Sequence, residues 1–342
     1  MAVLGSGGTG SNIGADFIRK GYNVVLIDQW PAHVETMKAN GLHVSMPGPG
    51  NDHDNLVEFQ VSTQALHLGE VCLLKRQFDT VFLACKSYDS RWMVEFIKPY
   101  MKSDGVLVTM QNGLNDEWIA PMVGYDQNIA CAFELSSVVV EPGMVKRNTD
   151  RITSVFVVGK PDGKITPQVQ EVAQVLSAVG RTVVTGNIWG YKWTKLIVNT
   201  ATMPLGSITG VWGSDYIQNP KYLGHAIKLG RETMEVSKAL GIVLEPLLGV
   251  TVGELASPTD EVVERMVLNL GSDLGKKVRN AFMQDISKGR PTEVDYLNGV
   301  VVRKGQEVNV PTPLNEAVTS LVKQIEQGTL RQSVSNLDLI VI

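Results

Sequence analysis

The 342-residue sequence contains only three cysteines and five histidines, the residue types that build disulfide scaffolds and many metal centres. Its three cysteines, Cys72, Cys85 and Cys131, are odd in number and far apart, and the last two lie in apolar, strand-like runs. Buried thiols in a reducing compartment explain this pattern better than disulfides do. The five histidines are scattered and lack metal-ligand spacing, so we expect no metal site.

Long apolar runs and an excess of basic charge are also missing. No run reaches membrane-spanning length, and the sequence opens in a predicted strand without a basic-then-apolar leader. The formal net charge is −4, whereas binding to nucleic acid or to anionic membranes usually requires a basic surface. G-x-S-x-G and P-loop motifs are absent too. We therefore expect a cytoplasmic protein whose partner is a small molecule, neither nucleic acid nor a membrane.

The first informative feature is a glycine-rich turn at the start of the chain. Residues 1–4 read as a short buried strand, and a helical pattern begins after the turn. In a G-x-G-x-x-G turn, the first glycine permits the tight bend, the second lets backbone N–H groups approach a pyrophosphate, and the third lets the helix pack closely. This context predicts a dinucleotide site rather than a merely structural turn, formed by Gly5, Ser6, Gly7, Gly8, Thr9 and Gly10.

The second predicted strand, residues 23–27, ends on Asp28. A carboxylate at this position can accept hydrogen bonds from the ribose hydroxyls of NAD and repels the 2′-phosphate of NADP. Residues 29–31 offer no positive charge that could compensate. We therefore expect NAD as the cofactor, with NADP less favoured. The alternative is that Asp28 only caps the following helix.

Strand and helix patterns alternate from residue 1 to about residue 187, which predicts a doubly wound, mostly parallel sheet. Within it we expect residues 46–54 to form an exposed loop and residues 138–145 to continue the sheet. Helical periodicity then dominates, so we predict a dinucleotide-binding domain over 1–187 and an all-helical domain over 188–342. Within the helical domain, three glycines and a proline predict a connection between two helices. They are Gly206, Gly210, Gly213 and Pro220. The apolar segment 337–342 is expected to pack against the body or a partner chain.

Further candidate site residues follow strands or lie on predicted helices. Lys86 and Asn112 each follow a buried strand, where ligands bind in doubly wound sheets. Lys195 and Asn199 are four residues apart on one helix face, and Glu293 precedes another apolar helix. Each of these residues also has an open structural explanation. Lys86 could be a solvated surface lysine, and Asn112 could serve the tight turn before Gly113. Lys195 and Asn199 could form a solvated helix edge, and Glu293 could be an acid favoured at a helix N-terminus.

Taken together, these motifs resemble the ketopantoate reductase family, which comprises 2-dehydropantoate 2-reductases and related D-2-hydroxyacid dehydrogenases. The resemblance rests on the glycine-rich turn, Lys86, Gln111-Asn112-Gly113, Lys195-Leu-x-x-Asn199, Gln284-Asp285-Ile286 and the motif at 292–299. It implies a Rossmann-type domain, a helical domain and an NAD(P) cofactor. In the family, Lys195 matches the proton donor and Glu293 matches a residue close to that lysine and the cofactor ribose. Asn112 and Asn199 match residues that line the substrate site, and Asn112 is also a candidate cofactor contact.

The sequence departs from the pantoate-forming enzymes at two positions. Met203 replaces a second asparagine, and Ala281 replaces a serine, with Asn280 beside it as a candidate substrate-binding residue. We therefore expect an oxidoreductase that transfers hydride from NAD(P)H to a 2-keto acid bulkier or more apolar than ketopantoate, giving a D-2-hydroxy acid. A homodimer is the expected assembly. The alternatives are a pantoate-forming reductase, a 6-phosphogluconate or 3-hydroxyacid dehydrogenase, and a non-catalytic NAD(H)-binding regulator.

Overall fold

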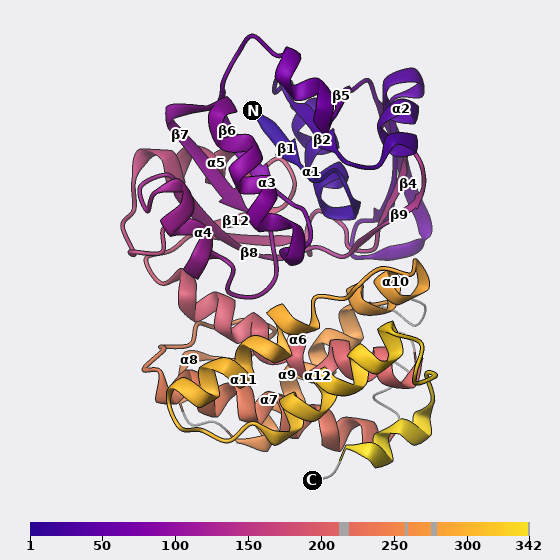
Figure 1. Cartoon of the computed structure of the whole chain (residues 1–342), viewed down its shortest axis with the longest axis vertical. Helices are drawn as coiled ribbons and strands as arrows, with labels where there is room; N and C mark the ends of the chain where they lie inside the picture. The colour runs from indigo at the N-terminus through magenta and orange to yellow at the C-terminus, as the bar shows by residue number, and fades with distance from the viewer. Residues whose placement is uncertain (212–218, 257–258, 275–278, 341–342) are drawn as a thin grey trace. The chain divides into compact units, whose positions relative to one another are not determined.

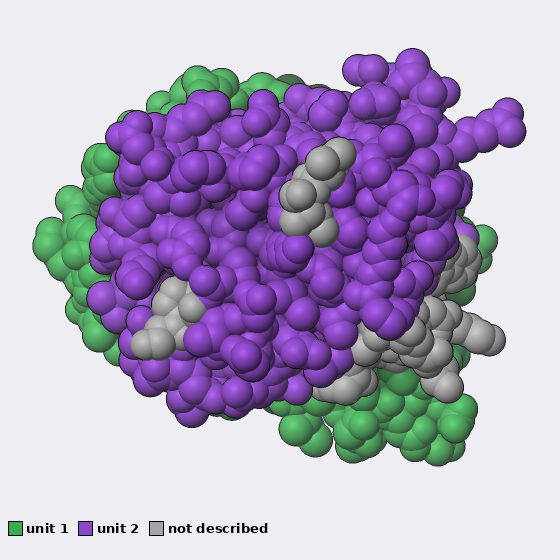
Figure 2. All heavy atoms as spheres, turned by 90° about the horizontal axis from the view of Figure 1, so that it is seen from below, with its two compact units in different colours: residues 1–111, 115–188 green, residues 112–114, 189–342 purple. Residues whose placement is uncertain are grey.

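The computed structural model describes residues 1–211, 219–256, 259–274 and 279–340, with 271–274 described by their backbone alone. The chain forms two compact units, shown in different colours in Figure 2. One comprises residues 1–111 and 115–188, and is called the sheet unit here. The other, the helical unit, comprises residues 112–114 and 189–342.

The sheet unit is built on one eight-stranded sheet in the order β12-β11-β8-β7-β6-β1-β2-β5. Figure 1 labels β7, β6, β1, β2 and β5 of this sheet in that order from left to right. Every neighbouring pair is parallel except β8 and β11. The strand order reverses its direction at β1, which places the glycine-rich turn at a topological switch point, where doubly wound sheets bind ligands. The strands are β1 Ala2–Leu4, β2 Val25–Asp28, β5 Gln64–His67, β6 Phe78–Leu83, β7 Met101–Thr109, β8 Asn128–Glu134, β11 Val155–Gly159 and β12 Arg181–Val184.

Helices cover both faces of this sheet. Val3 of β1 belongs to a core with Phe17 and Val172, whereas Ala2 and Leu4 belong to a second core with helices of the opposite face. The alternation arises because successive strand side chains point to opposite faces. The first face carries α1 Gly8–Arg19 and α5 Pro167–Leu176, and the second carries α3 Ser90–Ile97 and α4 Asp116–Val123. The predicted doubly wound fold is thereby confirmed.

A second sheet of four strands, in the order β4-β3-β10-β9, corrects two expectations. Residues 46–54 are not an exposed loop, because they belong to the hairpin of β3 Leu42–Gly48 and β4 Asp52–Val61, with Met46 buried. Residues 138–145 do not continue the main sheet. They form β9 Ser137–Glu141 and the start of β10 Met144–Arg147, and β10 pairs with β3 in parallel. Helix α2, Pro31–Asn40, precedes β3.

The helical unit packs around one apolar core that includes Trp193, Leu229 and Val318. The end of the chain contributes to it, since Leu337 and Ile340 are buried there. In the described parts of the chain no helix is long and apolar enough to cross a membrane. The helices are α6 Ile188–Thr209, α7 Pro220–Ala239, α8 Val252–Ala256, α9 Asp260–Leu274, α10 Ala281–Ser287, α11 Asn298–Glu307 and α12 Pro313–Glu326. Short 3₁₀ turns are η1 Leu68–Leu73, η2 Ser87–Asp89, η3 Lys98–Tyr100, η5 Val294–Tyr296 and η6 Val334–Leu339.

The predicted connection after α6 is only partly correct. Gly206 lies inside α6, where a Cβ would come within 2.6 Å of the Asn280 side-chain nitrogen, so glycine is needed for packing. Gly210, with φ of +74°, follows the end of the helix. Gly213 lies outside the described residues, and Pro220 begins α7.

Candidate active site

The glycine-rich turn has the geometry that its sequence predicts. Gly5 has a φ of +93°, and a Cβ on it would lie 2.6 Å from the Cys85 backbone nitrogen. A Cβ on Gly10 would overlap the carbonyl oxygen of Gly5. Both positions therefore require glycine, one for the bend and one for the close packing of α1 on β1.

The N-terminus of α1 fits a bound anionic group. Gly7 is the N-cap residue, and no side chain caps the helix or places an acid in its first turn. A Cβ on Gly7 would meet no atom within 4 Å, so the turn is open at this point. Unpaired N–H groups at a helix N-terminus attract phosphate. Ser6 is buried, and its hydroxyl lies 3.4 Å from the carbonyl oxygen of Ile27, to which it donates. Thr9 is partly buried in the first turn.

Asp28 lies at the carboxyl end of β2, beside the strand that leads into this turn. One of its carboxylate oxygens accepts a hydrogen bond of 2.9 Å from the backbone nitrogen of Trp30. The side chain thus shapes the turn into α2 but does not cap the helix, because its partner Trp30 is itself the N-cap residue and α2 has no side-chain cap. A carboxylate has further lone pairs, so this hydrogen bond is compatible with a second one to a ribose hydroxyl.

A buried polar network joins the loops that follow β6 and β7. Lys86 precedes η2 in the first loop, and Asn112 lies in the second. The Gln111 amide donates to the Cys85 carbonyl at 2.8 Å and to the Ser90 hydroxyl at 2.6 Å. Asn115 donates to the Ser87 hydroxyl at 2.8 Å. Sequence reasoning missed Gln111 and Asn115 as positioning residues, although both flank the Asn112-Gly113 pair.

In the helical unit, the segment 112–114 packs between α6 and η5. The Lys192 ammonium is buried and donates to the Gly113 carbonyl at 3.3 Å. On its other side, Gly113 is so close to η5 that a Cβ would lie 2.7 Å from the Tyr296 carbonyl oxygen. The structure thereby gathers Asn112, α6 and the turn after Glu293 within one unit.

Two of the predicted site residues in this unit are buried polar side chains. Glu293 and Asn199 are each 6% exposed. The Asn199 side-chain nitrogen has no hydrogen-bond partner among the described residues. Leaving a buried donor unsatisfied costs about 1–3 kcal/mol, which is a reason to look for a ligand. Lys195, one turn before it on α6, is partly buried.

Asn280 has a structural task instead. Its side-chain oxygen accepts from the Met283 backbone nitrogen at 3.0 Å and caps α10. Its side-chain nitrogen donates to the Met203 carbonyl at 3.2 Å. Both ends of the amide are therefore used within the protein. The predicted role in substrate binding gains no support from this arrangement.

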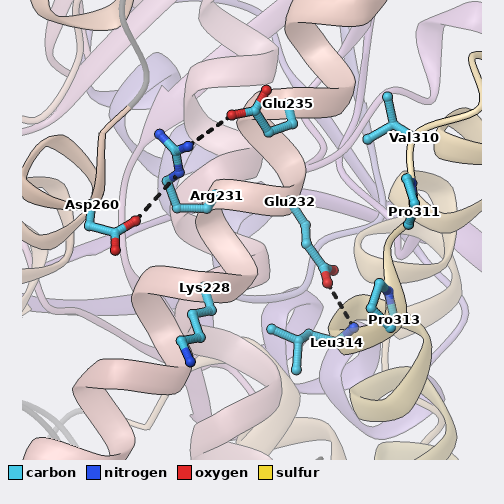
Figure 3. Close-up of a pocket in the computed structure, with 9 residues that line it drawn as sticks. All are labelled: Lys228, Arg231, Glu232, Glu235, Asp260, Val310, Pro311, Pro313 and Leu314. Atoms are coloured by element: carbon cyan, nitrogen blue, oxygen red, sulfur yellow. Dashed lines mark hydrogen bonds and ion pairs between the residues drawn. The ribbon is translucent and has the colours of Figure 1, made fainter. Parts of the chain in front are cut away.

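A hollow of about 590 Å³ elsewhere on the helical unit contains none of the predicted site residues (Figure 3). Four of the charged residues that line it, Arg231, Glu232, Glu235 and Asp260, are bonded within the protein. Arg231 lies between Glu235 at 2.9 Å and Asp260 at 3.4 Å. Glu232 accepts from the backbone nitrogens of Leu314 and Asn315, each at 2.9 Å. Burial raises the pKa of the Glu232 carboxyl, while these donors oppose the rise. Glu232 thus binds the first turn of α12, and Arg231 forms ion pairs with Glu235 and Asp260.

A doubly wound sheet with an open glycine-rich turn, followed by a helical unit with buried polar groups, defines a Rossmann-type dinucleotide-binding protein with an added helical domain. The chain belongs to the ketopantoate reductase PanE/ApbA family, a family of oxidoreductases. The family model matches residues 1–158, and its C-terminal model matches residues 187–326. The resemblance seen in the sequence motifs is thereby confirmed. Among the described residues there is no group of three or more His, Cys, Asp or Glu side chains that could hold a metal ion.

Known relatives extend over nearly the whole chain. A 2-dehydropantoate 2-reductase from Pyrococcus horikoshii is 27% identical over 95% of this chain and 96% of its own. An enzyme of the same name from Archaeoglobus fulgidus is 25% identical over 96% and 98% of the two chains. Among solved structures, a D-mandelate dehydrogenase with NADH and anilino(oxo)acetate has a TM-score of 0.80 at 23% identity. A ketopantoate reductase from Ralstonia eutropha has a TM-score of 0.78, also at 23% identity. Each structure covers 96% of this chain and is itself covered to 98%, and both share its fold.

Proposed function

We propose that the protein is an NAD(P)H-dependent reductase that converts a 2-keto acid into a D-2-hydroxy acid. The single observation that carries the proposal is the buried Asn199 nitrogen, which lacks a partner among the described residues and lies one turn from Lys195 on α6. A polar substrate is the kind of ligand that satisfies such a donor. The names of the relatives from Pyrococcus and Archaeoglobus support the reaction class.

The cofactor contacts are proposed residue by residue. The turn from Gly5 to Gly10 would take the pyrophosphate, Asp28 would take a ribose, and Lys86, Asn112 and Glu293 are further proposed cofactor-binding residues. The bound nicotinamide supplies the hydride that the keto acid accepts. The open space at Gly7 and the uncapped N-terminus of α1 fit this role.

On the substrate, Lys195 is the proposed proton donor. Its ammonium would hold the carbonyl oxygen, stabilise the negative charge that develops there, and transfer a proton to it. Asn199 and Asn112 would bind the keto acid. Glu293 would orient the lysine and the cofactor ribose. Asn280 is left out of this assignment, because its amide caps α10 and binds Met203.

An activity panel tests the proposal. NADH and NADPH oxidation are measured with ketopantoate, with 2-keto acids that carry branched or aromatic side chains, and with 3-keto acids. Turnover of a 2-keto acid is the expected result. Turnover of 3-keto acids alone would indicate the related dehydrogenase chemistry. Cofactor binding without turnover of any substrate would favour the non-catalytic regulator.

The relatives' names make 2-dehydropantoate 2-reductase the second candidate. Against it, Met203 lies one turn after Asn199 on α6, where the pantoate-forming enzymes usually have an asparagine. Its side chain is partly buried against the apolar core. A thioether has no N–H or O–H to donate, so it cannot replace the hydrogen bond of an asparagine amide. We therefore expect ketopantoate to be a poorer substrate than 2-keto acids with apolar or aromatic side chains, measured as kcat/KM.

The variant Met203→Asn probes this position directly. It is expected to raise kcat/KM for ketopantoate about tenfold, because one added hydrogen bond contributes on the order of 1.4 kcal/mol. Met203→Leu is the matched control and should give no gain. If the unmodified protein already preferred ketopantoate over every apolar competitor, Met203 would not limit the substrate.

Cofactor preference is expected to depend on Asp28. We predict that kcat/KM for NADH exceeds that for NADPH at least about tenfold. Two like charges about 4 Å apart repel by up to roughly 4 kcal/mol at an effective dielectric constant near 20, and each 1.4 kcal/mol is about tenfold.

Two variants separate the charge of Asp28 from its role in the turn. Asp28→Asn removes the charge and keeps an acceptor for the Trp30 nitrogen, whereas Asp28→Ala removes both. Both should narrow the preference for NADH, and the asparagine variant should retain more thermal stability. Equal rates with the two cofactors in the unmodified protein would contradict the prediction.

A further inference from the structure

His33 on α2 is a fully enclosed histidine that contacts the glycine-rich turn. The residue is 1% exposed. Its Nε2 lies 2.9 Å from the carbonyl oxygen of Ser6 and 3.2 Å from the Ser11 hydroxyl. Its Nδ1 lies 2.9 Å from the backbone nitrogen of Gly143, in the turn between β9 and β10. The Trp30 ring stacks on the imidazole with a centroid distance of 5.6 Å.

These contacts determine where the imidazole carries its proton. The Gly143 N–H can only donate, so Nδ1 is the acceptor and has no hydrogen. A neutral ring then carries its hydrogen on Nε2 and donates it to the Ser6 carbonyl. The Ser11 hydroxyl donates to the same carbonyl oxygen at 2.6 Å. Two donors from two helices therefore fix the direction of this carbonyl.

The direction of the Ser6 carbonyl also sets the direction of the next N–H group. The peptide bond is planar and trans, so the Ser6 C=O and the Gly7 N–H point in opposite directions. With the carbonyl held by His33 and Ser11, the Gly7 N–H points away from them. A Cβ on Gly7 would meet nothing within 4 Å, so there is space for a ligand at this residue.

We propose that His33 is a positioning residue for the cofactor: it holds the Ser6–Gly7 peptide so that the Gly7 N–H is presented to the pyrophosphate. This inference rests on the proposed dinucleotide site. It also assigns a task to the second sheet, because the β9–β10 turn supplies the N–H that selects the tautomer. That turn lies directly on α2, where a Cβ on Gly143 would come within 2.5 Å of the Thr36 methyl group.

The test compares three variants of His33 by fluorescence titration with NADH. Gln places an amide nitrogen near the position of Nε2 and keeps the donor to Ser6, whereas Asn reaches only the position of Nδ1. We expect His33→Asn and His33→Ala to raise the Kd for NADH at least about tenfold. His33→Gln should stay within about threefold of the parent. At saturating NADH, kcat should change less than about threefold in all three.

His225→Gln is the matched control, since His225 is a buried histidine of the helical unit, bonded to the Lys221 carbonyl at 2.7 Å. It should lower the melting temperature without changing the Kd for NADH. The parent protein gives an independent readout that needs no variant: its long-range ¹H–¹⁵N spectrum should show His33 as the Nε2-protonated neutral tautomer.

Three outcomes would overturn the inference: an asparagine variant that binds NADH as tightly as the parent, a glutamine variant as weak as alanine, or an Nδ1-protonated ring in the parent. These results differ from a failure of the proposed function. In that case the parent itself would turn over no 2-keto acid, or would bind neither NADH nor NADPH.

Discussion

Replacing Lys195 with alanine is expected to lower kcat at least about 100-fold while the protein stays folded. A positioned general acid typically contributes about 10²–10⁴-fold to the rate, and the same ammonium would stabilise the developing alkoxide. Alanine is the best helix former, so the substitution should leave α6 intact. Steady-state kinetics with the best 2-keto acid, together with circular dichroism, measure both parts of the prediction.

Lys192 is the competing candidate for the same role, because it lies one turn before Lys195. Its ammonium, however, is buried and bonded to the Gly113 carbonyl. Lys192→Met should therefore act mainly through the position of the 112–114 segment, with a smaller loss of kcat than Lys195→Ala. The exposed Lys238 on α7 gives a neutral control as Lys238→Ala. A Lys195→Ala protein within a few fold of the parent would mean that another group supplies the proton.

A second large effect is expected at a buried ion pair of the sheet unit. Asp16 on α1 and Arg147 on β10 are each 1% exposed, and the Arg147 Nη1 lies 2.8 Å from an Asp16 oxygen. The other terminal nitrogen of Arg147 donates to the Val179 carbonyl at 2.8 Å. Arg147→Met should lower the free energy of unfolding by about 3–5 kcal/mol, because it leaves the Asp16 charge buried without its main partner.

The double variant Asp16→Leu with Arg147→Met should recover most of this loss, since apolar residues of similar size often replace a buried pair without a net penalty. Arg151 also pairs with Asp16 but is 34% exposed, so Arg151→Met should lower stability by about 1 kcal/mol or less. Urea unfolding followed by circular dichroism compares the variants, and separate transitions of the two units are fitted separately. Equal losses in Arg147→Met and in the double variant would show that packing, not charge, dominates.

The sequence alone was sufficient for the features that depend on neighbouring residues. The short apolar strand, the three glycines and the following helix were predictable, because tight turns and close helix packing restrict the residue types that fit. The change from alternating strands and helices to helices alone was visible in the periodicity of apolar side chains. The family motifs around Lys195 and Glu293 were likewise readable without coordinates.

Only the tertiary structure decided the features that depend on distant partners. The pairing of β3 with β10 joins segments about a hundred residues apart, so nothing local distinguishes these strands from a loop or from the main sheet. For the same reason, sequence patterns could not show that Asn280 caps a helix against Met203. They could not place the 112–114 segment against η5, or enclose His33 between Ser6 and Gly143. The Asn280 and His33 side chains and the 112–114 segment each gain their role from a backbone group far away in the chain. Buried polar atoms must find partners wherever the fold supplies them.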